Sequence, residues 1–297
     1  MPWQAIDGII LLDKPTGLSS NQALQKVRRY FLAKKAGHTG TLDPLATGML
    51  PIAFGQATKF IQFLLDADKS YTATVQLGQA TTTGDSEGEP LAQQAVPELT
   101  ASQLQTVLHE FVGQVTQTPP IYSALKYQGK PMCYWARKGI VVPQKQRVVT
   151  IHSLTLLDWQ PDLAQLTFQA CCSKGTYVRT LSEDLAKKLG TLGHLIVLRR
   201  DHCAGFAATA MHTLDAVAAA QDSATLSTLL LPVDTGLQHC PLLDITPEQC
   251  AHLQQGRKQQ ADIVAPKTGW YRVVCADRFM GMLHYDQGIC ATKLLVG

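Results

Sequence analysis

The sequence predicts an α+β protein, with a large domain of strands and helices over residues 1–238 and a small β-rich domain over residues 239–297. The chain of 297 residues has the length of about two domains, and 45% apolar residues indicate a globular protein. Before residue 238, short apolar or alternating runs typical of strands are interspersed with helix-like patterns. After it, one helix signal is followed by several short strands.

The first third of the chain contains three strand patterns and two helix patterns. Ser19 or Ser20 is a suitable N-cap for the first helix, which we expect to continue to about Leu32. A clean alternation of apolar and polar residues predicts that the third strand is half-buried. In order, we expect a strand at Gly8–Leu12, the helix just described, a strand at Leu50–Ala53, a helix at Thr58–Leu65 and a strand at Tyr71–Leu77.

The middle of the chain is marked by two capping-box patterns. Thr100–Gln103 and Thr180–Glu183 each predict a helix start, and Gly190 can end the second helix. Gln160-Pro161-Asp162 indicates the turn of a hairpin. Around these we expect a loop at Thr81–Gln94, hairpin strands at Arg147–Trp159 and Leu163–Cys172, a strand at His194–Arg200, and short helices introduced by Thr213 and Ala224.

The last part of the chain has its own helix signal and strand signals. Thr246 is an N-cap with Pro247 at the first helical position, and Gly256 can follow the end of that helix. Short strands are predicted at Trp270–Cys275, Met280–Tyr285 and Ile289–Val296. A helix with several short strands in so few residues is typical of a small β-barrel.

The stretch Gly37–Leu50 is the strongest candidate for a functional loop. Its glycines allow sharp turns and close approach to a ligand, and Pro44 favours an extended conformation at Asp43. We expect a stiff loop that presents the Asp43 carboxylate, with His38 nearby. From the residues alone, a tight turn in which Asp43 bonds to its own backbone is the simpler interpretation.

Charge is distributed unevenly although the net charge is only +3. Residues 121–150 contain six basic residues and no acid, and few helix or strand signals. Residues 71–120 carry five acids and residues 201–240 carry four, both without Lys or Arg. Such a basic segment can bind a polyanion, although a solvated basic face fits it equally well.

The cysteine pattern and the hydropathy pattern exclude several classes of protein. The eight cysteines show no CxxC spacing and no accompanying His cluster, so we expect no zinc site and free core thiols. Such thiols are typical of a reducing compartment. No apolar run approaches the length of a membrane span, and no secretory signal is visible. We therefore expect a cytoplasmic protein without a membrane segment.

Three separated motifs resemble those of the bacterial tRNA pseudouridine-55 synthases, the TruB family. They are His38–Met49, Asp13–Asn21 and Ser173–Thr180, which occur in the family's order and cover nearly the whole chain. The resemblance implies a mixed-sheet catalytic domain with an RNA-binding thumb inserted at about 121–150, and a PUA-like RNA-binding domain at the C-terminal end. It also implies isomerisation of the T-loop uridine at position 55 of tRNA, without cofactor, metal or obligatory protein partner.

The resemblance also implies roles for individual residues. Asp43 would be the catalytic nucleophile, although attack on the sugar, attack on the base and removal of a ribose proton all remain open. Arg179, expected at the end of a Gly175–Arg179 strand, would keep that carboxylate ionised. Tyr71 would stack on the flipped uracil and assist at C5. Without the motif, a lone strand Tyr is more often a core residue.

The remaining candidates are expected to contact RNA or to support the site. His38 would bind the T loop, whereas Tyr177 and Leu198 would line the uracil pocket. Lys14 is a further candidate substrate-binding residue. Together with Pro15, it is also expected to brace the catalytic loop. Lys126 and Lys130 would neutralise phosphates from the thumb. Without the resemblance, the ordinary interpretations of these residues are a solvated surface position, a capping role or a core position.

Two other functions are compatible with the same motifs. One is a tRNA-binding or tRNA-folding chaperone in which catalysis is secondary. The other is a guide-dependent RNA pseudouridine synthase that acts inside a ribonucleoprotein. An inserted thumb and the lack of long basic tails favour a stand-alone tRNA-modifying enzyme.

Overall fold

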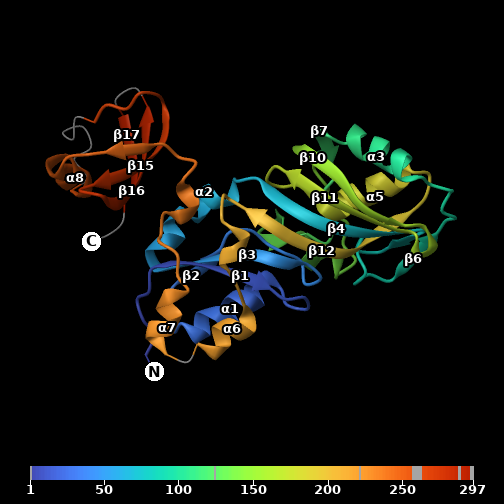
Figure 1. Ribbon diagram of the computed structural model, residues 1–297, viewed down its shortest axis with the longest axis horizontal. Helices are drawn as coiled ribbons and strands as arrows, with labels where there is room; N and C mark the ends of the chain where they lie inside the picture. Colours follow the sequence, from blue (N-terminus) through green and yellow to red (C-terminus); the bar gives the residue numbers. More distant parts are fainter. Residues whose placement is uncertain (1, 124, 221, 256–262, 287–288, 295–297) are drawn as a thin grey trace.

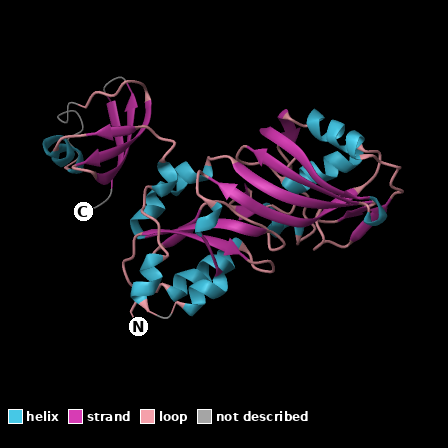
Figure 2. Ribbon diagram, viewed as in Figure 1, coloured by secondary structure: helices cyan, strands magenta, loops and turns pink. Residues whose placement is uncertain are grey.

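The computed structural model describes the chain except for residues 1, 124, 221, 256–262, 287–288 and 295–297. A nine-stranded mixed sheet forms its main body, with a separate four-stranded sheet at the C-terminal end (Figures 1 and 2). The large sheet has the order β13-β1-β3-β12-β4-β11-β10-β7, and β2 pairs with β3. The predicted α+β class with a mixed sheet is therefore confirmed.

Six strands of the large sheet lie close to their predicted positions, and three short ones, at Ala36–His38, Gly113–Gln117 and Met211–Thr213, were not predicted. In chain order, the strands are β1 (Gly8–Lys14), β2 (Ala36–His38), β3 (Thr47–Phe54), β4 (Lys69–Leu77), β7 (Gly113–Gln117), β10 (Arg147–Gln160), β11 (Gln165–Cys172), β12 (Gly193–Cys203) and β13 (Met211–Thr213). The predicted hairpin is confirmed, because β10 and β11 are antiparallel neighbours with Gln160 opposite Gln165.

Alternating side chains divide the large sheet into two packed faces. On β1, Ile10 and Leu12 belong to one core cluster, whereas Ile9 and Leu11 belong to another, as the period of two in a strand requires. The first cluster includes buried side chains of α1 (Ser20–Tyr30), α3 (Ala101–Glu110) and α5 (Val178–Lys188). The second is covered by η1 (Gly55–Phe60), α2 (Ile61–Leu65) and η4 (Thr235–Leu237).

Most predicted helix starts agree with the structure, but one does not. Thr100 caps α3 through a complete capping box, as predicted. Of the two N-cap candidates for α1, the structure selects Ser19, which also forms a capping box with Gln22. The capping box predicted at Thr180–Glu183 is wrong, because α5 already begins at Val178. The Thr180 hydroxyl donates to the Thr118 carbonyl and that of Ser182 to the Val178 carbonyl, so neither caps the helix.

Three further elements differ from the sequence-based boundaries. The expected loop at Thr81–Gln94 contains a strand, because β6 (Pro90–Gln93) pairs with β5 (Gln79–Thr81). The helix expected at Thr58–Leu65 starts earlier as a 3₁₀ turn, η1. The helix α7 (Ser223–Thr228) takes Asp222 as its N-cap, whereas α6 (Leu214–Ala219) is capped by Thr213 as predicted.

Before β10 begins at Arg147, the basic segment 121–150 forms only short elements, as its sequence indicates. A small hairpin of β8 (Lys126–Tyr127) and β9 (Lys130–Pro131) leads into α4 (Met132–Ala136). Trp135 contacts Tyr127 and Tyr134 edge-on, and Lys138 lies 4.6 Å from the centroid of the Tyr134 ring. Contacts among aromatic and cationic side chains therefore stabilise this segment in addition to its short hairpin and helix.

The C-terminal sheet has the order β14-β15-β16-β17 and its own apolar core, which includes Leu253 of α8 (Pro247–Gln254). Thr246 caps α8 as predicted, whereas Gly256 lies outside the described residues. Its strands are β14 (Leu242–Asp244), β15 (Gly269–Cys275), β16 (Arg278–Asp286) and β17 (Ile289–Leu294). Among the described pairings none joins β14 to β17, so closure of this sheet into a barrel stays a prediction. The domain boundary between residues 238 and 239 also stays a prediction.

Candidate active site

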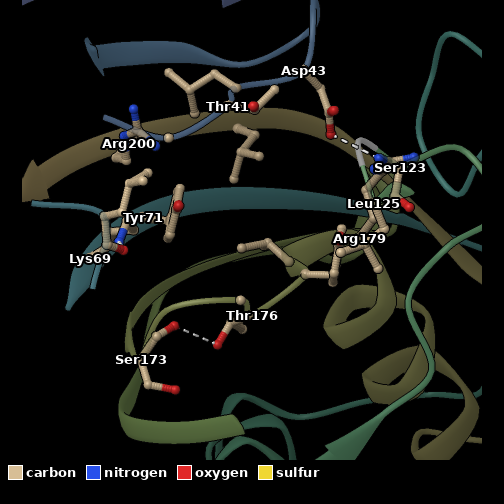
Figure 3. Close-up of a pocket in the computed structure, with 17 residues that line it drawn as sticks. Thr41, Asp43, Lys69, Tyr71, Ser123, Leu125, Ser173, Thr176, Arg179 and Arg200 are labelled. Carbon is tan, nitrogen blue, oxygen red and sulfur yellow. Dashed lines mark hydrogen bonds and ion pairs between the residues drawn. The ribbon is translucent and has the colours of Figure 1, made fainter. Parts of the chain in front are cut away.

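A pocket of about 400 Å³ opens where β4 and β12 meet the loop between β2 and β3 (Figure 3). The turn between β11 and α5 forms the facing wall, and Ser123 and Leu125 of the basic segment close one side. Asp43 and Arg179 lie at one end, whereas Lys69, Tyr71 and Arg200 lie at the other. Five segments far apart in the sequence thus contribute polar side chains to one cavity.

The loop that carries Asp43 is held by the segment after β1. The Ser20 hydroxyl accepts a hydrogen bond from the Leu42 amide at 2.7 Å and donates to the Leu42 carbonyl at 3.0 Å. The Gly17 amide donates to the Pro44 carbonyl at 2.8 Å. These bonds explain why the first motif accompanies the loop motif, since the one fixes the backbone of the other.

Asp43 forms an ion pair with Arg179, the second residue of α5. The distance from Nη2 of Arg179 to Oδ2 of Asp43 is 3.0 Å, and Nε of Arg179 lies 3.6 Å from Oδ2 of Asp85. Carbonyls of Thr83 and Tyr122 accept further hydrogen bonds from the guanidinium. The expected Gly175–Arg179 strand is wrong, because the segment turns into α5 and its helical geometry aims Arg179 at Asp43.

Burial and neighbouring charges act in opposite directions on Asp43. Burial raises the pKa of its carboxyl above the ordinary value, and the positive charge of Arg179 counteracts that rise. The negative charge of Asp85 raises the pKa further. The charged form of Asp43 is therefore less stabilised than the ion pair with Arg179 alone would suggest.

Tyr71 forms the wall opposite Asp43, together with Leu198 of the neighbouring strand. Tyr71 is 8% exposed and Leu198 7% exposed, and both line the pocket. Tyr177 stands at the N-cap of α5, where its amide donates to the Gln117 side chain at 3.0 Å. A ring, an aliphatic side chain and a carboxylate therefore face one cavity, as a pocket for a planar base with a reactive sugar would require.

Two family models together match a range of the chain that contains every residue lining the pocket. The model of the N-terminal domain of TruB family pseudouridylate synthases matches residues 28–178, and that of the C-terminal domain of tRNA pseudouridylate synthase B matches residues 179–238. The chain belongs to the TruB family of pseudouridylate synthases. The predicted family membership is confirmed.

Curated relatives of this TruB family chain match it over most of its length. It is 46% identical over 293 residues to tRNA pseudouridine synthase B of Neisseria meningitidis, with 98% of this chain and 94% of the relative covered. It is 49% identical over 257 residues to the enzyme of that name from a Marinomonas species, with 86% of this chain and 83% of the relative covered.

Solved structures share the fold of the TruB family chain at lower identity. A crystal structure of a Cbf5–Nop10–Gar1 complex matches with a TM-score of 0.72 and 22% identity, over 93% of this chain and 78% of that one. An archaeal box H/ACA Nop10–Cbf5 complex matches with a TM-score of 0.69 and 21% identity, over 94% and 79% of the two chains. These likenesses show a common fold.

Four of the predicted substrate-binding residues of this TruB family chain lie outside the pocket lining. His38, half-buried at the end of β2, has a pKa lowered by burial, and its Nδ1 is buried without a partner among the described residues. Lys14 is buried and donates to the carbonyls of Pro15, Leu18 and Pro44, which fits the expected brace. Lys126 and Lys130 are exposed on the β8–β9 hairpin, and their RNA contacts stay predictions.

Sequence reasoning missed several polar residues in or beside the pocket, among them Lys69, Asp85 and Arg200. Asp85 is buried, and its carboxylate accepts a hydrogen bond from the Glu87 amide at 3.1 Å, which orients it toward Arg179. The only sequence signal was a Gly84-Asp85 turn within an acidic stretch. No sequence pattern indicated a role for Arg200, because a basic residue at the end of an apolar strand is an ordinary feature.

No helix among the described residues combines the length and the apolar character needed to span a membrane.

Proposed function

We propose that this chain is a tRNA pseudouridine synthase that isomerises the T-loop uridine at position 55, as a stand-alone enzyme. Its curated relatives carry the name tRNA pseudouridine synthase B. The observation that carries the proposal is the Asp43–Arg179 ion pair at one end of a base-sized pocket whose other end holds the Tyr71 ring.

The isomerisation has modest chemical requirements. The N1–C1′ glycosidic bond breaks, a C5–C1′ bond forms, C5 loses a proton and N1 gains one. The reaction therefore consumes no redox equivalent and no phosphoryl donor. A carboxylate that attacks the nucleotide or accepts a proton from the ribose starts it, and a second group must help the C5 proton to leave.

Each of these needs has a candidate in the pocket. Asp43 is the reactive carboxylate, and Arg179 keeps it ionised and aimed at the cavity. Tyr71 stacks on the uracil after the nucleotide leaves the T loop, and its hydroxyl assists removal of the C5 proton. Leu198 and Tyr177 complete the walls around the base.

The basic segment 121–150 is the proposed thumb. Its Ser123 and Leu125 already border the pocket, and the Tyr122 carbonyl accepts a hydrogen bond from Arg179 at 2.8 Å. Lys126 and Lys130, on the exposed hairpin that follows, would contact phosphates of the T stem-loop. A purely RNA-folding role gives no reason for a buried guanidinium shared between Asp43 and Asp85.

Incubation of the purified chain with a synthetic T stem-loop RNA, followed by chemical detection of pseudouridine, tests the proposal. We expect conversion at position 55 with no other protein or RNA present. The matched controls are the Asp43→Asn variant and a stem-loop with cytidine at that position, which should both give no product. A requirement for a guide RNA or a protein partner would contradict the stand-alone function, and binding without product would favour the chaperone.

A further inference from the structure

Arg200 on β12 is a cation in an unusual position. It is 1% exposed, and its Nε donates to the Met49 carbonyl at 2.7 Å. Arg179 and Arg199 have acidic partners, but no acid pairs with Arg200 within the part of the chain that the structure describes. Its Nη2 is buried and without a hydrogen-bond partner there. Such a buried, unpaired charge destabilises a fold and calls for a functional reason.

The strand register brings Arg200 next to Tyr71. The two residues are direct partners in the antiparallel pair of β12 and β4, so their side chains lie on the same face, with Cβ atoms about 5 Å apart. On the neighbouring strand β11, Tyr71 pairs with the small Ala170. Figure 3 shows both Arg200 and Tyr71 at the end of the pocket opposite Asp43.

The neighbouring strand β3 also fits closely around Arg200. Gly48 pairs with Arg200, has a φ of +96°, and a Cβ at its position would lie 2.3 Å from the Arg200 carbonyl oxygen. Any larger residue would push β12 away from β3. The last glycine of the Asp43 loop thus allows the backbone position from which Arg200 reaches both Met49 and Tyr71.

The chemistry of a guanidinium restricts what Arg200 can do to a phenol. Arginine has donors and no acceptor, so the Tyr71 oxygen must accept and its own hydrogen must point away. The pKa of Tyr71 is raised above its ordinary value, chiefly by burial, and the charge of Arg200 and its hydrogen bond to the phenol limit that rise. The other titratable groups facing the phenol, Cys172 and Cys203, act in the same direction as burial.

We propose that Arg200 is a positioning residue for Tyr71, holding the phenol oxygen in the pocket and stabilising the phenolate form that takes the C5 proton. In that step the phenolate, whose own proton has left to solvent, takes the C5 proton. The electron pair of the C5–H bond forms the C5–C6 double bond, and the N1–C6 π pair moves to N1, which takes up a proton from solvent. The hydrogen bond from Nε of Arg200 to the Met49 carbonyl anchors the guanidinium in this position. The inference rests on the acid–base role proposed for Tyr71.

A double-mutant cycle tests the inference. The wild type, Tyr71→Phe, Arg200→Lys and the double variant are compared by single-turnover pseudouridine formation on the T stem-loop and by the Kd for that RNA. We expect Arg200→Lys to slow the reaction about tenfold or more with little change in Kd. In the Tyr71→Phe background the same change should have almost no effect, because the group it acts on is gone.

Arg199→Lys is the matched control on the same strand. Arg199 pairs with Asp13 at 2.9 Å and lies outside the pocket lining, so any effect should be equal in both backgrounds. If the Arg200→Lys variant does not fold, the same cycle is run with Arg200→Gln. Glutamine keeps a donor for the Met49 carbonyl but has no charge.

The outcomes separate this inference from the function on which it rests. Equal rate losses from Arg200→Lys in both backgrounds would show that Arg200 is only structural and would overturn the inference while leaving the role of Tyr71 intact. A Tyr71→Phe variant as fast as the wild type would overturn both. Loss of RNA binding in Arg200→Lys, with an unchanged reaction rate at saturation, would also overturn it.

Discussion

Arg179 is the buried partner of its ion pair with Asp43, and Asp43 is the accessible one. The guanidinium side chain is 5% exposed, whereas the carboxylate is 37% exposed, with 3.0 Å between their nearest atoms. Asp85 and two backbone carbonyls hold the cation from behind. The carboxylate can therefore meet a nucleotide in the pocket while its counter-charge stays in place.

The change Asp43→Asn tests the role of this carboxylate most directly. The amide keeps the shape of the side chain but loses its charge and its nucleophilicity, so turnover should fall by more than about 10⁴-fold. Tryptophan fluorescence and the Kd for the T stem-loop should stay near the wild-type values. Appreciable single-turnover conversion in this variant would remove Asp43 from the nucleophile role.

The pH dependence of kcat/KM should report the ionisation of Asp43. The reaction needs the carboxylate, so the rate should fall as acidification protonates it, at a pH above the ordinary carboxyl range because burial raises its pKa. The Asp85→Asn change removes a negative charge that also raises that pKa. Its acid limb should therefore move to lower pH, and a limb that stays in place or moves up would contradict this coupling.

Lys14 should affect stability in a pH-dependent way. Lys14→Met removes the donor to three carbonyls and should lower the free energy of unfolding by about 1–3 kcal/mol at pH 7. Burial lowers the pKa of Lys14 from 10.5 to about 8 in the folded protein. Between these values the unfolded chain binds more protons at Lys14, so wild-type stability rises with pH relative to the variant.

Denaturant unfolding of both proteins at pH 7 and pH 9.5 measures this difference. The gap should widen by about 1–2 kcal/mol at the higher pH. A gap that is constant or narrows would show that the pKa of Lys14 is not lowered in the folded protein.

The basic segment should determine RNA affinity more than chemistry. Replacing Lys126, Lys130 and Lys138 by Gln should weaken binding of the T stem-loop and reduce the slope of log Kd against log salt by up to about 2–3, since fewer counterions are released. The control is the same replacement at the exposed Lys26, Lys187 and Lys188. Equal slopes for both triple variants would show that 121–150 is only a solvated face.

Tyr71→Phe separates the two contributions of the ring and the hydroxyl. The ring still stacks, so RNA binding should be nearly unchanged, whereas the rate should fall about 10²–10⁴-fold through loss of acid–base assistance. Tyr71→Ala should also weaken binding, because stacking on a displaced base contributes about 1–3 kcal/mol. A Tyr71→Phe rate equal to that of the wild type would reduce Tyr71 to a stacking surface.

The amino-acid sequence by itself determined the features that depend on neighbouring residues. The capping box at Thr100 starts a helix where its spacing predicts, and one of the two predicted N-cap candidates, Ser19, starts the first helix. The alternating pattern from Tyr71 to Leu77 forms a strand with one buried face. Local motifs also indicated the family and the Asp43 loop, because turn chemistry and motif spacing are written in contiguous residues.

Only the tertiary structure decided which distant side chains meet. Arg179 belongs to a helix because α5 begins before the capping box, and Asp85 faces it from a loop that sequence patterns leave undefined. Arg200 becomes a pocket residue through its pairing with Tyr71 on one side and Gly48 on the other. Strand register and burial between segments far apart in the chain produce these contacts, and no local periodicity encodes them.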